Sequence, residues 1–82
     1  MNYLTKNLDK IHTTEMGKSR IKKNLDIKIE DVDEWCKRKI KKSDLAIQRG
    51  KNWYVHTDDL IITINASSYT VITAHKKETF KR

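Results

Sequence analysis

The sequence predicts an α+β domain with two or three N-terminal helices packed on one face of a four-stranded antiparallel meander. Helix-like spacing of apolar residues fills the first half of the chain, whereas the last third alternates apolar and polar residues as strands do. Helices that precede strands are typical of the α+β class. The 82 residues include no proline and only two glycines, and no tract resembles a linker, so we expect one domain over residues 1–82.

The first two helices are expected before residue 26. Apolar residues at Leu4, Leu8 and Ile11 suit one face of a short helix, which residues 12–14 interrupt. Thr13 or Thr14 is suited to cap the second helix. Gly17 lies inside that second helix and costs about 1 kcal/mol relative to alanine, so we expect a close packing contact there.

The third helix has the clearest pattern. Acidic residues crowd its start near residue 30 and basic residues crowd its end near residue 42, as the helix macrodipole favours. Its apolar stripe comprises Ile29, Val32, Cys36 and Ile40, with Trp35 alongside. Cys36 is the only cysteine, which rules out an internal disulfide and fits a small core or half-buried residue in a reducing compartment.

Four strands should follow. Residues 45–49 form the first, and Gly50 provides the turn into the second, over residues 51–57. A two-residue loop at Asp58-Asp59 pairs Tyr54 with Thr63, and a three-residue loop at residues 66–68 pairs Ile61 with Thr73.

The two hairpin registers sort the strand residues onto two unlike faces. The face expected to pack on the helices carries Trp53, Val55, Leu60, Ile62, Ile64, Ile72 and Ala74. The other face collects polar, aromatic and histidine side chains, namely Tyr54, His56, Thr63, Asn65, Tyr69, Thr73 and His75. A slip of one residue in either hairpin would exchange the two sets.

The charge of the chain favours a polyanionic partner. Eighteen Lys and Arg residues against eleven Asp and Glu residues give a net charge of +7. The candidate nucleic-acid-binding residues are Lys18, Lys22, Lys23, Lys37, Arg38 and Lys41, with Tyr54 as a base-stacking residue. The alternative is a lysine-rich surface that only confers solubility, and cations at a helix C-terminus are favourable without any ligand.

The histidines and hydroxyl groups suggest a metal-free ribonuclease as one possibility. Such an enzyme requires a base for the ribose 2′-hydroxyl, an acid for the leaving 5′-oxygen and a cation for the phosphate. The candidate catalytic residues are His12, Arg20, Tyr69, Thr73 and His75. The alternative is a solvated histidine beside threonines that favour strands. The spacing of the three histidines and Cys36 matches no zinc motif, so neither a metal nor a cofactor is predicted.

The segments KNLDKIHTTEMGKSRIKKNL, DVDEWCKRKI and KNWYVHTDDLIITINASSYTVITAHK carry two resemblances. The chain resembles, nearly end to end, a family of short bacterial and phage-associated proteins known only as a domain of unknown function. Its layout also looks like small toxin domains of the barnase–EndoU–colicin–RelE ribonuclease superfamily. That likeness implies roles for His12, Arg20 and the VITAHK strand, which match the superfamily's order of histidine, helical arginine and polar strand.

The first functional reading is therefore a small RNA-cleaving or RNA-binding domain of a toxin–antitoxin or phage-defence system. The rival is a non-enzymatic module, which either binds nucleic acid or is a phage-encoded inhibitor that covers a host protein's nucleic-acid groove or grips an acidic patch. A homodimer would cover an open sheet face or edge. No apolar run reaches membrane-spanning length and no signal-peptide core is present, so we expect a cytoplasmic protein without a membrane partner.

Overall fold

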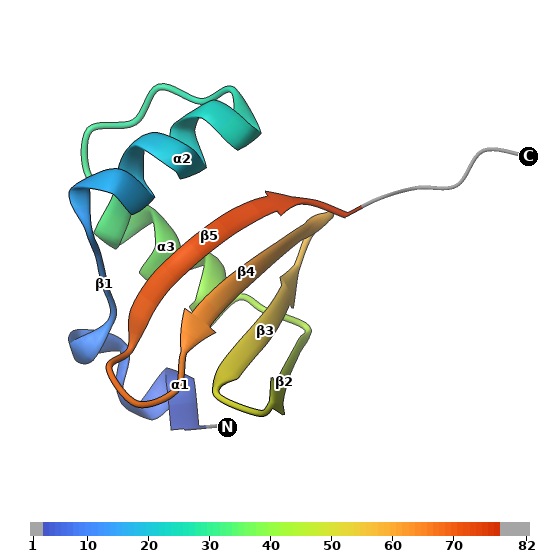
Figure 1. Cartoon of the computed structure of the whole chain (residues 1–82). Coiled ribbons are helices and arrows are strands. Elements are labelled where there is room, and N and C mark those ends of the chain that lie inside the picture. Colours follow the sequence, from blue (N-terminus) through green and yellow to red (C-terminus); the bar gives the residue numbers. More distant parts are fainter. Residues whose placement is uncertain (1–2, 78–82) are drawn as a thin grey trace, which may run out of the picture.

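Two long helices and a five-stranded mixed sheet form the α+β fold of the chain (Figure 1). The computed structural model describes residues 3–77. The helical elements are α1 (Tyr3–Lys6), a 3-10 turn (Leu8–Lys10), α2 (Glu15–Leu25) and α3 (Val32–Lys41). The strands are β1 (His12–Thr13), β2 (Leu45–Arg49), β3 (Asn52–Thr57), β4 (Leu60–Asn65) and β5 (Thr70–Lys76). The α+β class is confirmed, whereas the expected strand and helix counts differ in detail.

The sheet has the strand order β1-β5-β4-β3-β2. Strands β2 to β5 form the expected antiparallel meander. The short strand β1 adds a fifth, parallel strand beside β5, with His12 opposite Thr70 and Thr13 opposite Val71. The prediction of a four-stranded, purely antiparallel sheet is therefore wrong, because a two-residue strand is too short to show a repeat in the sequence.

The expected cap is present at α2, and α3 has a cap that was not predicted from the sequence. The Thr14 hydroxyl accepts a hydrogen bond from the Gly17 N–H at 3.0 Å, and the Asp31 carboxylate accepts one from the Glu34 N–H at 3.0 Å. The first helix expected over residues 4–11 is instead split into the four-residue α1 and the 3-10 turn.

Gly17 allows α2 to approach the sheet closely, as the sequence predicted. A Cβ atom at this position would lie 3.0 Å from Thr13 Cγ2 and 3.4 Å from the carbonyl oxygen of Val71. Glycine therefore lets the first turn of α2 rest on β1 and β5, and this contact offsets the low helix propensity of the residue.

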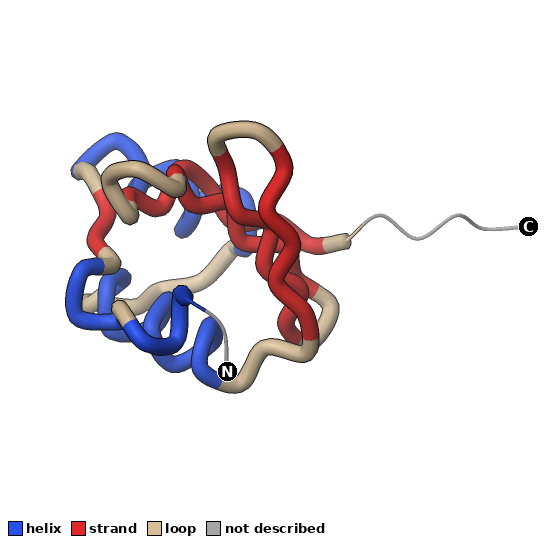
Figure 2. The backbone as a smooth tube through the Cα atoms, turned by 90° about the horizontal axis from the view of Figure 1, so that it is seen from below, coloured by secondary structure: helices blue, strands red, loops and turns tan. Residues whose placement is uncertain are grey.

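The core lies between the helices and one face of the sheet. Figure 2 shows the helices to one side of the long strands, whose opposite face no described element covers. The core contains Ile21, Leu25, Val32, Cys36, Ile40, Val55, Ile62, Ile64, Val71 and Ala74. Cys36 is fully buried, which confirms the expected core position. Burial raises the pKa of its thiol to about 12, and the nearby Asp33 carboxylate adds to that rise.

The β3–β4 hairpin has the predicted register, with Tyr54 opposite Thr63 and Thr57 opposite Leu60. Asp58 takes a left-handed conformation with φ of 54° in the expected two-residue loop. The β4–β5 register differs from its prediction, because the structure pairs Ile61 with His75 rather than with Thr73.

Two one-residue differences explain the change in the β4–β5 register. First, Tyr69 is part of the loop, with φ of 58° and its N–H bonded to the carbonyl oxygen of Asn65. Second, β5 has one extra residue at this point: Thr63 pairs with Thr73, but the next residue, Ile64, pairs with Val71 and not with Ile72. Val71 is consequently buried and Ile72 is 36% exposed, so the predicted inward position of Ile72 is wrong.

Candidate nucleic-acid interface

The uncovered sheet face is less polar than the sequence suggested. The register aligns Leu45, His56, Ile61 and His75 in one row across this face, and Ile47, Tyr54, Thr63 and Thr73 in the next. Leu45 is 51% exposed and Ile47 is 39% exposed. The face thus mixes apolar side chains with rings and hydroxyl groups. Its outward strand positions include no aspartate or glutamate.

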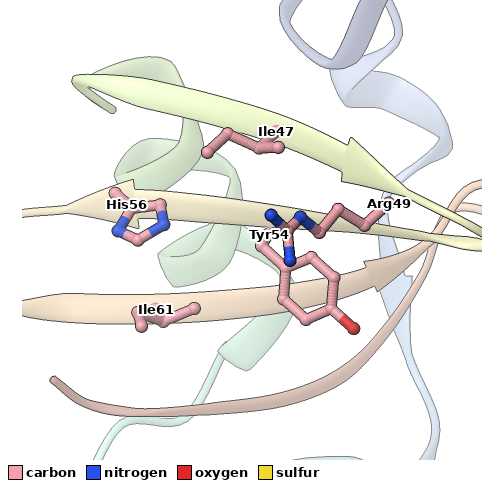
Figure 3. Close-up of a pocket in the computed structure, with 5 residues that line it drawn as sticks. All are labelled: Ile47, Arg49, Tyr54, His56 and Ile61. Carbon is pink, nitrogen blue, oxygen red and sulfur yellow. The ribbon is translucent and has the colours of Figure 1, made fainter. Parts of the chain in front are cut away.

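A hollow of about 310 Å³ opens on this face over β2, β3 and β4. Figure 3 shows Ile47 and Ile61 on either side of His56, and the Arg49 side chain reaching from β2 toward the ring of Tyr54. We call this hollow, lined by Ile47, Arg49, Tyr54, His56 and Ile61, the sheet hollow. Tyr54 and His56 are half-buried, so the sheet holds their rings while part of each remains accessible.

The side chains of the sheet hollow suit a flat ring that carries or adjoins negative charge. Tyr54 and His56 offer aromatic surface, the two isoleucines offer apolar walls, and Arg49 offers a permanent positive charge. A volume of about 310 Å³ lies at the low end of small-molecule sites, which span roughly 300–1,000 Å³. A stacked nucleobase with its phosphate near Arg49 fits this chemistry.

A second hollow, of about 240 Å³, lies on α3 and is lined by Trp35, Arg38, Lys39 and Lys42. We call it the α3 groove. The Lys39 ammonium lies 5.8 Å from the centre of the Trp35 ring and 2.9 Å from the Asp58 carboxylate. The hydrogen bond and the charge of Lys39 together lower the pKa of Asp58. Arg38 and Lys42 form no ion pair within residues 3–77, although the charge of Lys42 also contributes to the lowered pKa of Asp58.

The α3 groove lies near the end of the sheet at which β2 begins, and the sheet hollow extends along the uncovered face from His56 to Arg49 at the other end of β2. Lys42 follows α3 directly, and three residues later Leu45 begins β2 opposite His56. The Asp44 N–H donates to the carbonyl oxygen of His56 at 2.9 Å, while Asp58, the partner of Lys39, lies in the loop after β3. Because α3 packs on the inner face of the sheet, a ligand that contacts both hollows must pass around this end.

The cations predicted on α2 lie elsewhere. α2 runs along β5, at the opposite edge of the sheet from β2 (Figure 1). Lys18 pairs with Glu15 at 3.5 Å, and Lys23 is exposed. On α3, Lys37 is half-buried whereas Arg38 and Lys41 are exposed. The structure thus separates the two predicted basic clusters, and among the predicted cations Arg38 lines the α3 groove.

The structure does not bring the two candidate catalytic histidines together. His12 lies opposite Thr70, and His75 is five residues further along β5, or about 16 Å at the usual rise of a strand. His75 is exposed, with Nδ1 3.1 Å from the carbonyl oxygen of Lys76. Arg20 is exposed on α2, and the Thr73 hydroxyl accepts a hydrogen bond from the Asn24 side chain at 3.2 Å.

His12 instead ties β1 to the β4–β5 hairpin. Its Nε2 atom lies 3.0 Å from the Thr70 hydroxyl, which lies 2.8 Å from the Ser68 hydroxyl. Its Nδ1 atom lies 2.9 Å from the carbonyl oxygen of Lys10, which can only accept, so Nδ1 carries a proton. Tyr69 is partly buried against the core, with the Lys10 ammonium 5.7 Å from its ring centre.

Sequence reasoning missed the residues that complete the two hollows, although signals for them were present. Alternation over residues 45–49 places Ile47 and Arg49 on the face of Tyr54, which the hairpin at Gly50 already implied. Lys42 and Lys39 lie one turn apart on α3, and Trp35 lies one turn before Lys39, so helical spacing gathers all three.

A family model described as "Protein of unknown function (DUF3781)" matches residues 5–75. No curated protein and no solved structure matches the chain significantly. Within residues 3–77, every helix is too short or too polar to cross a membrane.

Proposed function

We propose that this chain, which belongs to the DUF3781 family, binds single-stranded nucleic acid across the sheet hollow and the α3 groove. The observation that carries the proposal is the pair of hollows, one with ring-stacking side chains and the other with cations, joined by the short connection from Lys42 to Leu45. Bases would stack in the first and phosphates would lie along the second.

Single strands suit the sheet hollow better than duplexes do. Stacking on Tyr54 requires a base whose flat face is free, and bases in a duplex hide that face. RNA is the first ligand to test because its loops and ends expose unstacked bases. Apolar walls from Ile47 and Ile61 accept any base, so we expect little sequence preference.

The α3 groove supplies the electrostatic part of the interaction. Arg38 and Lys42 are exposed and form no ion pair within the described residues, and together with Trp35 they line the α3 groove. Cations that contact phosphates release bound counterions, which makes affinity fall as salt rises. The helix C-terminus stabilises these cations by itself, so their mere presence is no evidence of binding. What supports the proposal is their position beside an indole and the short connection from Lys42 to β2, which lines the sheet hollow.

The sequence suggested a domain that either cleaves or binds RNA, and we propose binding. The cleaving form used His12 and His75 as acid and base, and these must approach the same phosphate from its two sides. Their separation along β5 and the hydrogen bonds of His12 to Thr70 and Lys10 favour a structural role for His12.

The cations of the α3 groove are expected to govern affinity. Replacing both Arg38 and Lys42 with alanine should weaken binding of a labelled single-stranded RNA and flatten the dependence of log K on log salt. Each phosphate contact contributes roughly 0.7 to that slope for single strands, so the loss of two should lower it by about 1.4. Fluorescence anisotropy at several salt concentrations measures both quantities.

The matched control for this experiment is the pair Lys22→Ala and Lys23→Ala, which removes the same charge from α2. Net charge changes equally in both double variants, so a larger loss for Arg38 and Lys42 locates the phosphates at the α3 groove. Equal losses would show diffuse attraction to the whole basic surface and would contradict the proposed interface.

RNA incubated with the protein is expected to remain intact. Within residues 3–77, His12 lies opposite the start of β5 and far from His75, while His56 and His75 lie in one row with Ile61 between them, so no two histidines are neighbours in the sheet. Gel electrophoresis of diverse RNAs after incubation in a chelator tests this expectation. Fragments that end in 2′,3′-cyclic phosphate, and that disappear with the His75→Ala variant, would restore the ribonuclease reading.

A further inference from the structure

The two edges of the sheet are unequally protected. Beside β5, the Asn24 side chain of α2 donates to the Thr73 hydroxyl at 3.2 Å and to the carbonyl oxygen of Ala74 at 3.4 Å, while β1 pairs with the start of the same strand. β2 forms the other edge, and no described element pairs with its outer side. An exposed edge strand can pair with another strand unless the protein blocks it.

The register shows which backbone groups of β2 are free. A two-residue turn at Gly50 and Lys51 makes Arg49 and Asn52 a hydrogen-bonded pair, and the pattern repeats at every second residue. Leu45, Ile47 and Arg49 therefore direct their N–H and C=O groups toward β3. Ala46 and Gln48 direct theirs outward, at the free edge.

This edge is complementary to a second copy of itself. In an antiparallel arrangement about a two-fold axis at Ile47, Ala46 of each copy faces the partner's Gln48, and all four outward residues exchange hydrogen bonds. The two Ile47 side chains, each 39% exposed in one chain, then meet on the open face.

The charges at the ends of β2 favour the same arrangement. Asp44 precedes β2, whereas Arg49 and Lys51 lie at its other end. Antiparallel pairing brings Asp44 of each copy near the basic end of the other, whereas parallel pairing would place like charges together. A second copy of the chain is therefore a more suitable partner for this edge than an arbitrary strand.

We propose that β2 pairs antiparallel with β2 of a second copy, which joins the two sheets into one. Ile47 and Arg49 line the sheet hollow, so the two hollows then adjoin across the new pairing, and the partner's Leu45 extends each hollow beside Arg49. The inference concerns the edge of the sheet and does not depend on the identity of the ligand.

The test is the molar mass of the full chain in solution, measured by size-exclusion chromatography with light scattering in the absence of nucleic acid. The parent protein should show twice the chain mass of 9.7 kDa and shift toward the monomer on dilution. Gln48→Pro removes an outward N–H without breaking the β2–β3 ladder, and Ile47→Lys places two like charges on the two-fold axis. Both variants should be monomeric at the concentration at which the parent is a dimer.

Ile72→Lys is the matched control, because Ile72 is 36% exposed on β5, away from β2. It should keep the parent mass, and far-UV circular dichroism should show that all variants are folded. A parent that is monomeric at every concentration would overturn the proposal, as would a dimer that survives in the folded Gln48→Pro and Ile47→Lys variants. Either failure would leave nucleic-acid binding by the monomer untouched, so the two proposals are separable.

Discussion

Replacing Ile62 with alanine is expected to lower the free energy of unfolding by about 2–5 kcal/mol. Ile62 is fully buried, and the register places it between Val55 on β3 and Ala74 on β5. Its removal takes apolar atoms out of the centre of the sheet's inner face and leaves a cavity that the neighbouring strands cannot fill. Urea unfolding followed by circular dichroism measures the change.

Ile72→Ala is the control for this prediction and also tests the irregularity in β5. The sequence alone places Ile72 with Ile62 on the core face, whereas the structure leaves it 36% exposed and buries Val71 instead. The expected cost of Ile72→Ala is therefore about 0.5 kcal/mol or less, typical of a surface substitution. A cost equal to that of Ile62→Ala would contradict the register of β5.

Tyr54→Ala is expected to weaken binding of single-stranded RNA by about 5-fold to 150-fold. Stacking of one base on an aromatic side chain contributes roughly 1–3 kcal/mol, which corresponds to that range of affinity. The ring of Tyr54 lines the sheet hollow and is half-buried, so part of the ring remains accessible to a ligand. Fluorescence anisotropy with a short labelled oligonucleotide, at one fixed salt concentration, measures the change.

Tyr54→Phe is the matched control, because it retains the ring and removes only the hydroxyl group. Its affinity should stay close to that of the parent protein. The salt dependence of both variants should also equal that of the parent, since neither substitution removes a charge. An unchanged affinity for Tyr54→Ala would exclude the sheet hollow as a base-stacking site, even if the cations of α3 prove to bind phosphate.

The parts of the fold that were predictable are those with local signals. α3 was clear because its acidic start, basic end and apolar stripe agree, and the Asp31 cap is consistent with that start. The β3–β4 hairpin was predictable because a two-residue loop fixes the register of the alternating residues on either side.

The β4–β5 hairpin was only partly predictable. A loop longer than expected by one residue reversed the side of Val71 and Ile72, and the bulge that follows restored the predicted side for Thr73 and His75. This irregular segment contacts β1 and α2, because the carbonyl oxygen of Tyr69 accepts a hydrogen bond from the His12 N–H at 3.2 Å and Gly17 lies close to Val71. Such tertiary constraints leave no trace in a single sequence.

The candidate site was predictable as a face but not as a pair of hollows. Tyr54 and His56 were placed together by alternation along β3. The position of the α3 groove near the end of the sheet at which β2 begins depends on the path from Lys42 to Leu45 and on the contact of Lys39 with Asp58. The separation of His12 from His75 likewise depends on the parallel pairing of β1, which joins residues 58 positions apart in the chain.

Chemical-shift mapping on the isotope-labelled protein tests the proposed interface most directly. Titration with a short single-stranded RNA should shift the amide signals of Arg49, Tyr54 and His56 on the sheet and those of Arg38 and Lys42 at the end of α3. The signals of Lys22 and Lys23 on α2 should move little. Shifts confined to α2 and β5, or no shifts at a salt concentration that permits binding, would contradict nucleic-acid binding by these two hollows.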